Sequence, residues 1–121
     1  MPRFMMIVKA SEESEAGTMP TKEMLAEMGA YNDQLQQSGA MLAGEGLRPS
    51  SAGARVTYSD GPPVVTEGPF GGRAKDLVAG FWVIRAGSMD EALEWARRIP
   101  FREGEVEVRP VFEASDFPDG P

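Results

Sequence analysis

Two long apolar runs dominate the hydrophobic pattern of the chain, and both predict β-strands. They cover Phe4–Val8 and Leu77–Ile84, and in each the apolar side chains stand at consecutive positions. Because side chains along a strand point alternately to its two faces, such a run predicts a strand with both faces buried. Between them, Ala40–Leu47 has an extended pattern that is interrupted by Gly44 and Gly46, so we predict a short or bulged strand there.

A helical spacing follows the first run. Apolar residues recur at i, i+4, i+7 and i+11 between Met24 and Leu35, which predicts a helix with one apolar face. Thr18 or Thr21 can cap the start of this helix, and Gly39 is the kind of residue at which helices commonly end.

A second helix and a final strand are predicted toward the C-terminus. Ser88 and Glu91 have the spacing of a capping box, and Pro100 sets the end of the helix that they open. Glu105–Glu113 then alternates between apolar and charged residues, which is typical of a strand with one face on the core. Pro110 lacks a backbone donor, so this strand is predicted at a sheet edge.

The remaining segments are predicted as a hairpin and two loops. Arg55–Tyr58 and Val64–Thr66 are β-like runs joined by the turn-rich Ser59–Pro63, which together predict a β-hairpin. The polar Ser11–Gly17 and the glycine-rich Gly68–Ala74 are predicted as loops.

The predicted elements run in the order strand, helix, strand, hairpin, strand, helix, strand. Without the hairpin this order is βαββαβ, so we predict an α+β, ferredoxin-like fold with an inserted β-hairpin. We expect right-handed crossovers between neighbouring parallel strands, with the first and third core strands in the middle of the sheet. Residues 1–113 are predicted to form one domain, and residues 114–121 an acidic flexible tail.

This topology leaves one face of the sheet without a cover. Two helices cover only one face of a four-stranded sheet, yet both central strands are apolar on both faces. A bare apolar face on the order of several hundred Å² is a liability in a monomer. We therefore expect a homodimer in which the equivalent faces of two copies pack together. The alternative is that the hairpin folds back over this face.

Composition narrows the chemistry that the chain can perform. The 121 residues include 41% apolar and 26% charged residues, as in an ordinary globular domain, and carry a formal net charge of −7. That charge argues against nucleic acid and against an anionic membrane surface as partners. The absence of cysteine and histidine excludes thiolate catalysis, Ser-His-Asp triads and thiolate or imidazole metal sites. No cofactor is predicted, and the lack of an export signal and of disulfides favours a cytoplasmic location.

The turn Thr66–Phe70 is the most individual feature of the sequence. Its Gly-Pro step predicts a sharp bend, and Phe70 can anchor that bend in the core. The glycine-rich stretch behind it carries Arg73 and Lys75, which together with backbone N–H groups could hold an anion. The alternative is that these are solvated loop charges, which is favoured because their spacing matches neither a P-loop nor a dinucleotide-binding motif.

The same turn resembles the signature of a known family. Glu67-Gly68-Pro69-Phe70 stands where DGPF-type proteins of the YCII-related family have Asp-Gly-Pro-Phe. The resemblance is colinear from Phe4 to about Val111 and includes further matching residues: Gly44–Leu47, Pro49, Lys75, Gly80 and Glu105–Pro110. It implies a bacterial protein that dimerises as an α+β barrel, with a cleft between sheets and helices. Most members have no assigned function, and relatives in the wider superfamily include isomerases, monooxygenases and decarboxylating or dehalogenating enzymes.

The matching acids and bases are candidates for a site. Glu45 or Glu67 is a candidate general base, and Arg109 or Lys75, with Arg73 nearby, would hold an anionic small molecule. The alternative is that Arg109 forms structural ion pairs with Glu45 or Glu67. Glu67 replaces the aspartate of the family, and a His–Asp mechanism suspected in some members cannot operate without histidine. We expect small-molecule binding, with or without cofactor-independent catalysis, or alternatively a non-catalytic interaction module.

Overall fold

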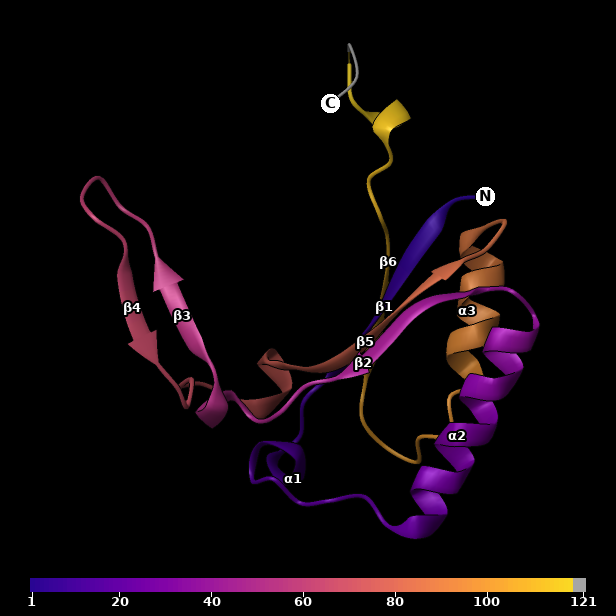
Figure 1. Ribbon diagram of the computed structural model, residues 1–121, viewed down its shortest axis with the longest axis horizontal. Coiled ribbons are helices and arrows are strands. Elements are labelled where there is room, and N and C mark those ends of the chain that lie inside the picture. The colour runs from indigo at the N-terminus through magenta and orange to yellow at the C-terminus, as the bar shows by residue number, and fades with distance from the viewer. Residues whose placement is uncertain (119–121) are drawn as a thin grey trace.

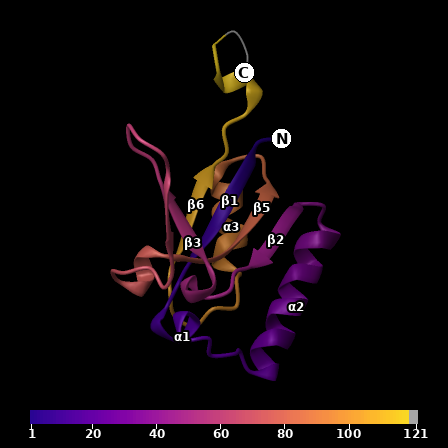
Figure 2. The same cartoon turned by 60° about the vertical axis from the view of Figure 1, so that its left-hand side comes forward.

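The computed structural model describes residues 1–118, which form a four-stranded antiparallel sheet with helices on one side (Figure 1). The strands are β1 (Arg3–Lys9), β2 (Met41–Gly46), β5 (Val78–Arg85) and β6 (Val106–Pro110). They lie in the order β2-β5-β1-β6 (Figure 2), so the α+β, ferredoxin-like fold and the two central strands are as predicted.

The expectation of neighbouring parallel strands is wrong. Every neighbouring pair in the sheet is antiparallel. One helical crossover joins β1 to β2, and β5 lies between these two strands. The other joins β5 to β6, and β1 lies between them. The strands that each helical crossover joins are therefore separated by an antiparallel neighbour.

Two helices, α2 (Lys22–Gln37) and α3 (Met89–Arg97), cover one face of the sheet (Figure 1). Of the two threonines that could cap α2, Thr21 does so, and its hydroxyl accepts a hydrogen bond from the helix backbone. Ser88 caps α3 in the same way, and α3 ends ahead of Pro100. Both helix starts are thus set by residues that the sequence identifies.

The polar segment after β1 contains a short helix, α1 (Glu12–Glu15), where the sequence predicts a loop. Ser11 and Ser14 cap it reciprocally, each side chain accepting a hydrogen bond from the backbone N–H of the other. The prediction missed this helix because it has no buried residue and therefore no apolar periodicity.

The core lies between the sheet and the two long helices. Its largest fully buried side chains are Met6, Leu35 and Ile84. Tyr31 packs edge-on against Trp82 with ring centroids 5.6 Å apart, and the Trp82 indole N–H donates to Asn32 Oδ1 at 2.9 Å. Tyr31 and Trp82 are therefore core residues, and their polar atoms are satisfied within the core.

The opposite face of the sheet is uncovered in the single chain. Four apolar side chains alternate with the core positions of β1 and β5, and all are partly exposed: Met5, Ile7, Phe81 and Val83. The prediction that both central strands are buried on both faces is thus wrong for the isolated chain. Each of these strands buries one face under the helices and leaves its other apolar face partly in water.

The inserted hairpin does not supply the missing cover. Its strands, β3 (Ala54–Thr57) and β4 (Val64–Glu67), pair as predicted, but they stand away from the sheet (Figure 1). Every residue of both strands is exposed. The alternative in which the hairpin folds back over the open face is therefore wrong.

The segment that follows β6 is joined to the first strand. Arg3 and Glu113 form a two-pronged ion pair with a shortest separation of 2.9 Å, which ties the end of the predicted domain to β1. The predicted tail over residues 114–121 begins with a 3-10 helix, Ala114–Asp116. The part of that prediction that covers residues 119–121 lies outside the described residues.

Candidate functional site

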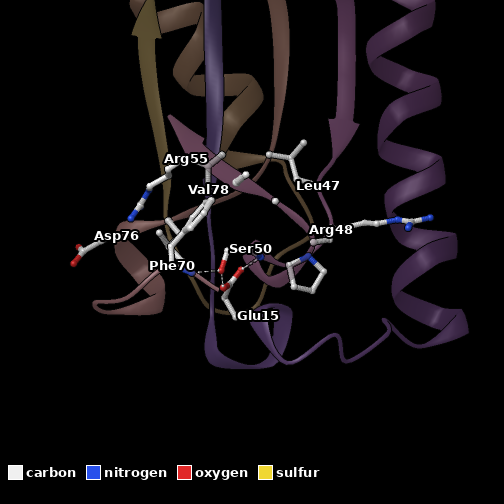
Figure 3. A pocket seen from close by; sticks show the side chains of 13 residues that line it. Glu15, Leu47, Arg48, Ser50, Arg55, Phe70, Asp76 and Val78 are labelled. Atoms are coloured by element: carbon white, nitrogen blue, oxygen red, sulfur yellow. Dashed lines mark hydrogen bonds between the residues drawn. The ribbon is translucent and has the colours of Figure 1, made fainter. Parts of the chain in front are cut away.

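A buried serine joins three segments that are distant in sequence. The Ser50 hydroxyl donates to Glu15 Oε1 at 2.5 Å, and the Ser50 backbone N–H donates to Glu15 Oε2 at 2.9 Å. The same hydroxyl accepts a hydrogen bond from the Phe70 backbone N–H at 3.0 Å (Figure 3). Ser50 thereby connects α1, the loop after β2 and the Gly-Pro-Phe turn, and we call this group the Ser50 junction.

The turn lies against the Ser50 loop so closely that only glycine fits at position 68. A Cβ placed on Gly68 would stand 1.8 Å from the carbonyl oxygen of Ser50. The Gly68 N–H donates to the carbonyl oxygen of Gly53 at 2.9 Å, and the Gly68–Pro69 peptide bond is cis. The glycine of the signature turn is thus required by backbone contact.

A cavity of about 540 Å³ opens beside this junction. Its apolar walls are formed by Leu47, Pro49, Phe70, Leu77 and Val78. Pockets that bind small molecules typically have volumes of roughly 300–1,000 Å³, mostly apolar walls and a few polar groups that orient the ligand. In size and lining this cavity matches that description.

One cation lies at the rim of the cavity. The guanidinium carbon of Arg55 stands 4.0 Å from the centre of the Phe70 ring, an arrangement that fixes the charge over the cavity wall. Within residues 1–118 the Arg55 side chain forms no hydrogen bond and no ion pair, so its N–H groups are open to a ligand. Arg48 belongs to the lining loop, but its side chain points away toward α2 (Figure 3).

The Glu15 carboxylate is already engaged in hydrogen bonds within the junction. Hydrogen bonds from the Ser50 hydroxyl and backbone N–H hold the pKa of the Glu15 carboxyl below its ordinary value. Glu15 is therefore ionised at neutral pH, and both of its oxygens accept hydrogen bonds from Ser50. This arrangement suits a structural anchor better than a general base.

The predicted ligand-binding residues Arg73 and Lys75 lie in a neighbouring hollow of about 910 Å³. It shares Glu15, Phe70 and Leu77 with the first cavity. Arg73 is paired with Asp76 through two hydrogen bonds of 3.1 Å, and this contact lowers the pKa of Asp76. Arg73 therefore has a partner within its own loop.

The two predicted catalytic acids lie in different places. Glu45 borders a separate cavity of about 230 Å³ at the end of the sheet, together with Asn32 and Trp82. Glu67 ends β4 and is exposed, and its side chain forms no hydrogen bond or ion pair with residues 1–118. Neither acid lines the cavity at the Ser50 junction.

Arg109 does not meet either acid in the single chain. Its cross-strand partner is Met5, so Arg109 lies on the open face of the sheet, whereas the adjacent Val108 faces the core. The carboxylate paired with Arg109 is that of Glu107, at 3.8 Å. Glu45 belongs to the other edge strand, three strand spacings or roughly 14 Å away. The predicted pairing of Arg109 with Glu45 is therefore not formed.

Among the polar residues that line the cavity, sequence reasoning missed Glu15, Ser50 and Arg55. Glu15 and Ser50 lie in segments without hydrophobic periodicity, and their hydrogen bonds join positions 35 residues apart. Arg55 lies on a hairpin strand that is exposed along its whole length. The one local signal was the turn itself, because its phenylalanine provides both a wall of the cavity and the platform for Arg55.

Two further features of residues 1–118 bear on function. Among residues 1–118 no cluster of three or more Asp or Glu side chains is arranged to hold a metal ion. None of the helices in this range has the length and apolar character needed to span a membrane.

Comparison with known proteins gives two findings. The model of the YCII-related domain matches residues 2–115, nearly the whole chain. An uncharacterised protein of Rhizobium meliloti (strain 1021) is 30% identical over 93 residues, which is 74% of this chain and 74% of that protein. The residues matched by the family include the whole of the sequence that builds the site.

Proposed function

The chain belongs to the YCII-related domain family, and we propose that it binds a small molecule in the cavity at the Ser50 junction. The observation that carries this proposal is an unpaired guanidinium fixed at the rim of a cavity with apolar walls. The Gly-Pro-Phe turn supports the proposal because it forms one wall and holds the junction together.

The positions of the charges define the class of ligand. Arg55 offers a planar group with several N–H donors, which suits a carboxylate or a similar planar anion. Glu15 lies next to Ser50, and its negative charge disfavours an anion on that side of the cavity. We therefore expect a small carboxylate whose charged end lies at the rim on Arg55 and whose apolar body packs between Leu47 and Val78.

Binding without catalysis is the form of the proposal that the cavity supports best. Two acids line it: Glu15 has both oxygens engaged by Ser50, and Asp76 has both oxygens engaged by Arg73. Glu45 and Glu67 lie elsewhere. A general base needs a free oxygen within hydrogen-bond reach of the proton that it removes.

A calorimetric titration with a panel of small aliphatic and aromatic carboxylates tests the proposal. Replacing Arg55 with Ala removes a charge-assisted contact, and such contacts contribute about 1.5–3 kcal/mol, so affinity should fall roughly 10- to 100-fold. Arg48→Ala is the matched control, because Arg48 lies in the loop between β2 and β3 and its side chain points away from the cavity. Equal affinity in the Arg55 variant, or equal loss in the Arg48 variant, would rule out this site.

We also propose that the chain forms a homodimer through the open face of its sheet. The support is the partly exposed apolar face made by Met5, Ile7, Phe81 and Val83, which the hairpin does not cover. Packing two such faces together removes this surface from water. Sedimentation velocity should then give a dimer at micromolar concentration that Val83→Lys dissociates. A monomeric wild-type protein under these conditions would refute the assembly.

A further inference from the structure

The hairpin formed by residues 54–67, here called the arm, is a second apolar surface without a partner. Large apolar side chains along it are exposed: Val56 to 46%, Val64 to 58%, Val65 to 64% and Tyr58 to 76%. No residue of its two strands is buried by another part of residues 1–118. An isolated two-stranded hairpin is marginally stable in water, so an arm of this kind needs a surface to pack on.

The pairing of the arm's strands shows which of its faces is the apolar one. Val56 stands opposite Val65, and Ala54 stands opposite Glu67, so these four side chains share one face. The other face carries Arg55, Thr57, Val64 and Thr66. Since Arg55 reaches back over Phe70, that second face is engaged with the base of the arm, whereas the Val56–Val65 face has no contact of this kind.

We propose that the Val56–Val65 face of the arm packs on a second copy of this chain and that the two arms clasp the homodimer reciprocally. This proposal rests on the dimer put forward above. The arm stands on the side of the molecule opposite α2 and α3, which is also the side of the open sheet face (Figure 1). A copy that approaches the open face therefore arrives next to the arm.

The size of the open face supports a role for the arms in this dimer. The face spans four strands, or roughly 19 Å, and about five residues along each strand, or roughly 17 Å. Its flat footprint is then on the order of 320 Å² per copy, and two footprints give about 650 Å². Stable specific interfaces bury about 1,200–2,000 Å², so the sheet faces alone fall short.

The two arms bring the interface up to the required size. Each arm presents a ribbon about 14 Å long and about 10 Å wide. Two such ribbons and the partner surface beneath them bury roughly another 550 Å². A second copy is the partner that fits, because a two-fold contact covers both open faces and both arms at the same time.

The test compares two double variants with the same change in charge. Val56→Lys with Val65→Lys places charges on the apolar face, whereas Thr57→Lys with Thr66→Lys places them on the opposite face of the same strands. All four positions are exposed in the single chain, so both variants should fold, which circular dichroism will verify. We expect the valine variant to raise the dissociation constant of the dimer at least about 100-fold and the threonine variant to change it much less.

Hydrogen exchange provides a second and independent measurement. The amides of residues 54–67 should exchange fast below the dissociation constant of the wild-type dimer and become protected above it. If the wild-type protein is monomeric, both the dimer and the clasp are wrong. If it is a dimer whose dissociation constant the valine variant leaves unchanged, or whose arm amides are never protected, the dimer stands and the clasp is overturned.

Discussion

Replacing Gly68 with Ala tests whether the Gly-Pro-Phe turn holds the Ser50 junction together. The added Cβ would stand 1.8 Å from the Ser50 carbonyl oxygen, whereas such contacts are essentially never below 3.0 Å, so the two segments must separate by about 1.2 Å. That movement breaks the hydrogen bond of 2.9 Å from Gly68 to Gly53. A lost hydrogen bond costs about 1 kcal/mol and forced overpacking costs about 1–3 kcal/mol, so we expect a loss of about 2–4 kcal/mol in the free energy of unfolding.

Differential scanning calorimetry measures this loss directly. At roughly 4 °C per kcal/mol for a domain of this size, the melting temperature should fall by about 8–16 °C. Gly71→Ala is the matched control, because Gly71 lies three positions further along the chain and a Cβ there meets nothing within 4 Å. We expect the control to stay within about 2 °C of the wild type. A Gly68 variant that melts as the control does would show that the close approach of the two segments is not required.

Three further predictions concern the junction and the core. Ser50→Ala leaves the Phe70 N–H without its partner and should lower the free energy of unfolding in urea by about 2–3 kcal/mol. Because the pKa of Glu15 is lowered in the folded state, its ionised carboxylate stabilises the protein fully above the ordinary pKa of 4.5. This stabilisation is lost as the pH falls through the folded-state pKa, so the difference in stability between wild type and Glu15→Gln should shrink at lower pH. Burial raises the pKa of Tyr31 to about 12, so its contribution is present below pH 10 and lost between 10 and 12. In the Tyr58→Phe protein Tyr31 is the one remaining tyrosine, and absorbance titration should show its phenol ionising with a pKa of about 12.

The strands and long helices could be predicted from the sequence because their signals are local. Alternation placed Val106 and Val108 toward the core, and single side chains such as Thr21 and Ser88 set the starts of both long helices. The order of the strands followed from the βαββαβ pattern, although the direction of neighbouring strands did not. α1 was missed because a helix without buried residues leaves no pattern of apolar positions.

The candidate site could not be predicted in the same way because it is made by contacts between distant segments. Glu15 and Ser50 meet only when α1 folds under the loop after β2, and no local pattern reports that contact. Conversely, Glu45 and Arg109 were grouped by their position in the family pattern, yet they lie on opposite edges of the sheet. Charge and family position therefore indicated candidate residues, and the fold decided which of them meet.

The position of ligand binding is the most direct test of the proposed function. In an NMR titration of the ¹⁵N-labelled protein with the tightest carboxylate of the panel, saturable shifts should cluster at residues 47–55 and 70–78, which line the cavity at the Ser50 junction. Shifts that cluster at residues 44–46 and 79–82, around the smaller cavity beside Glu45, would contradict the proposal, as would the absence of any saturable shift.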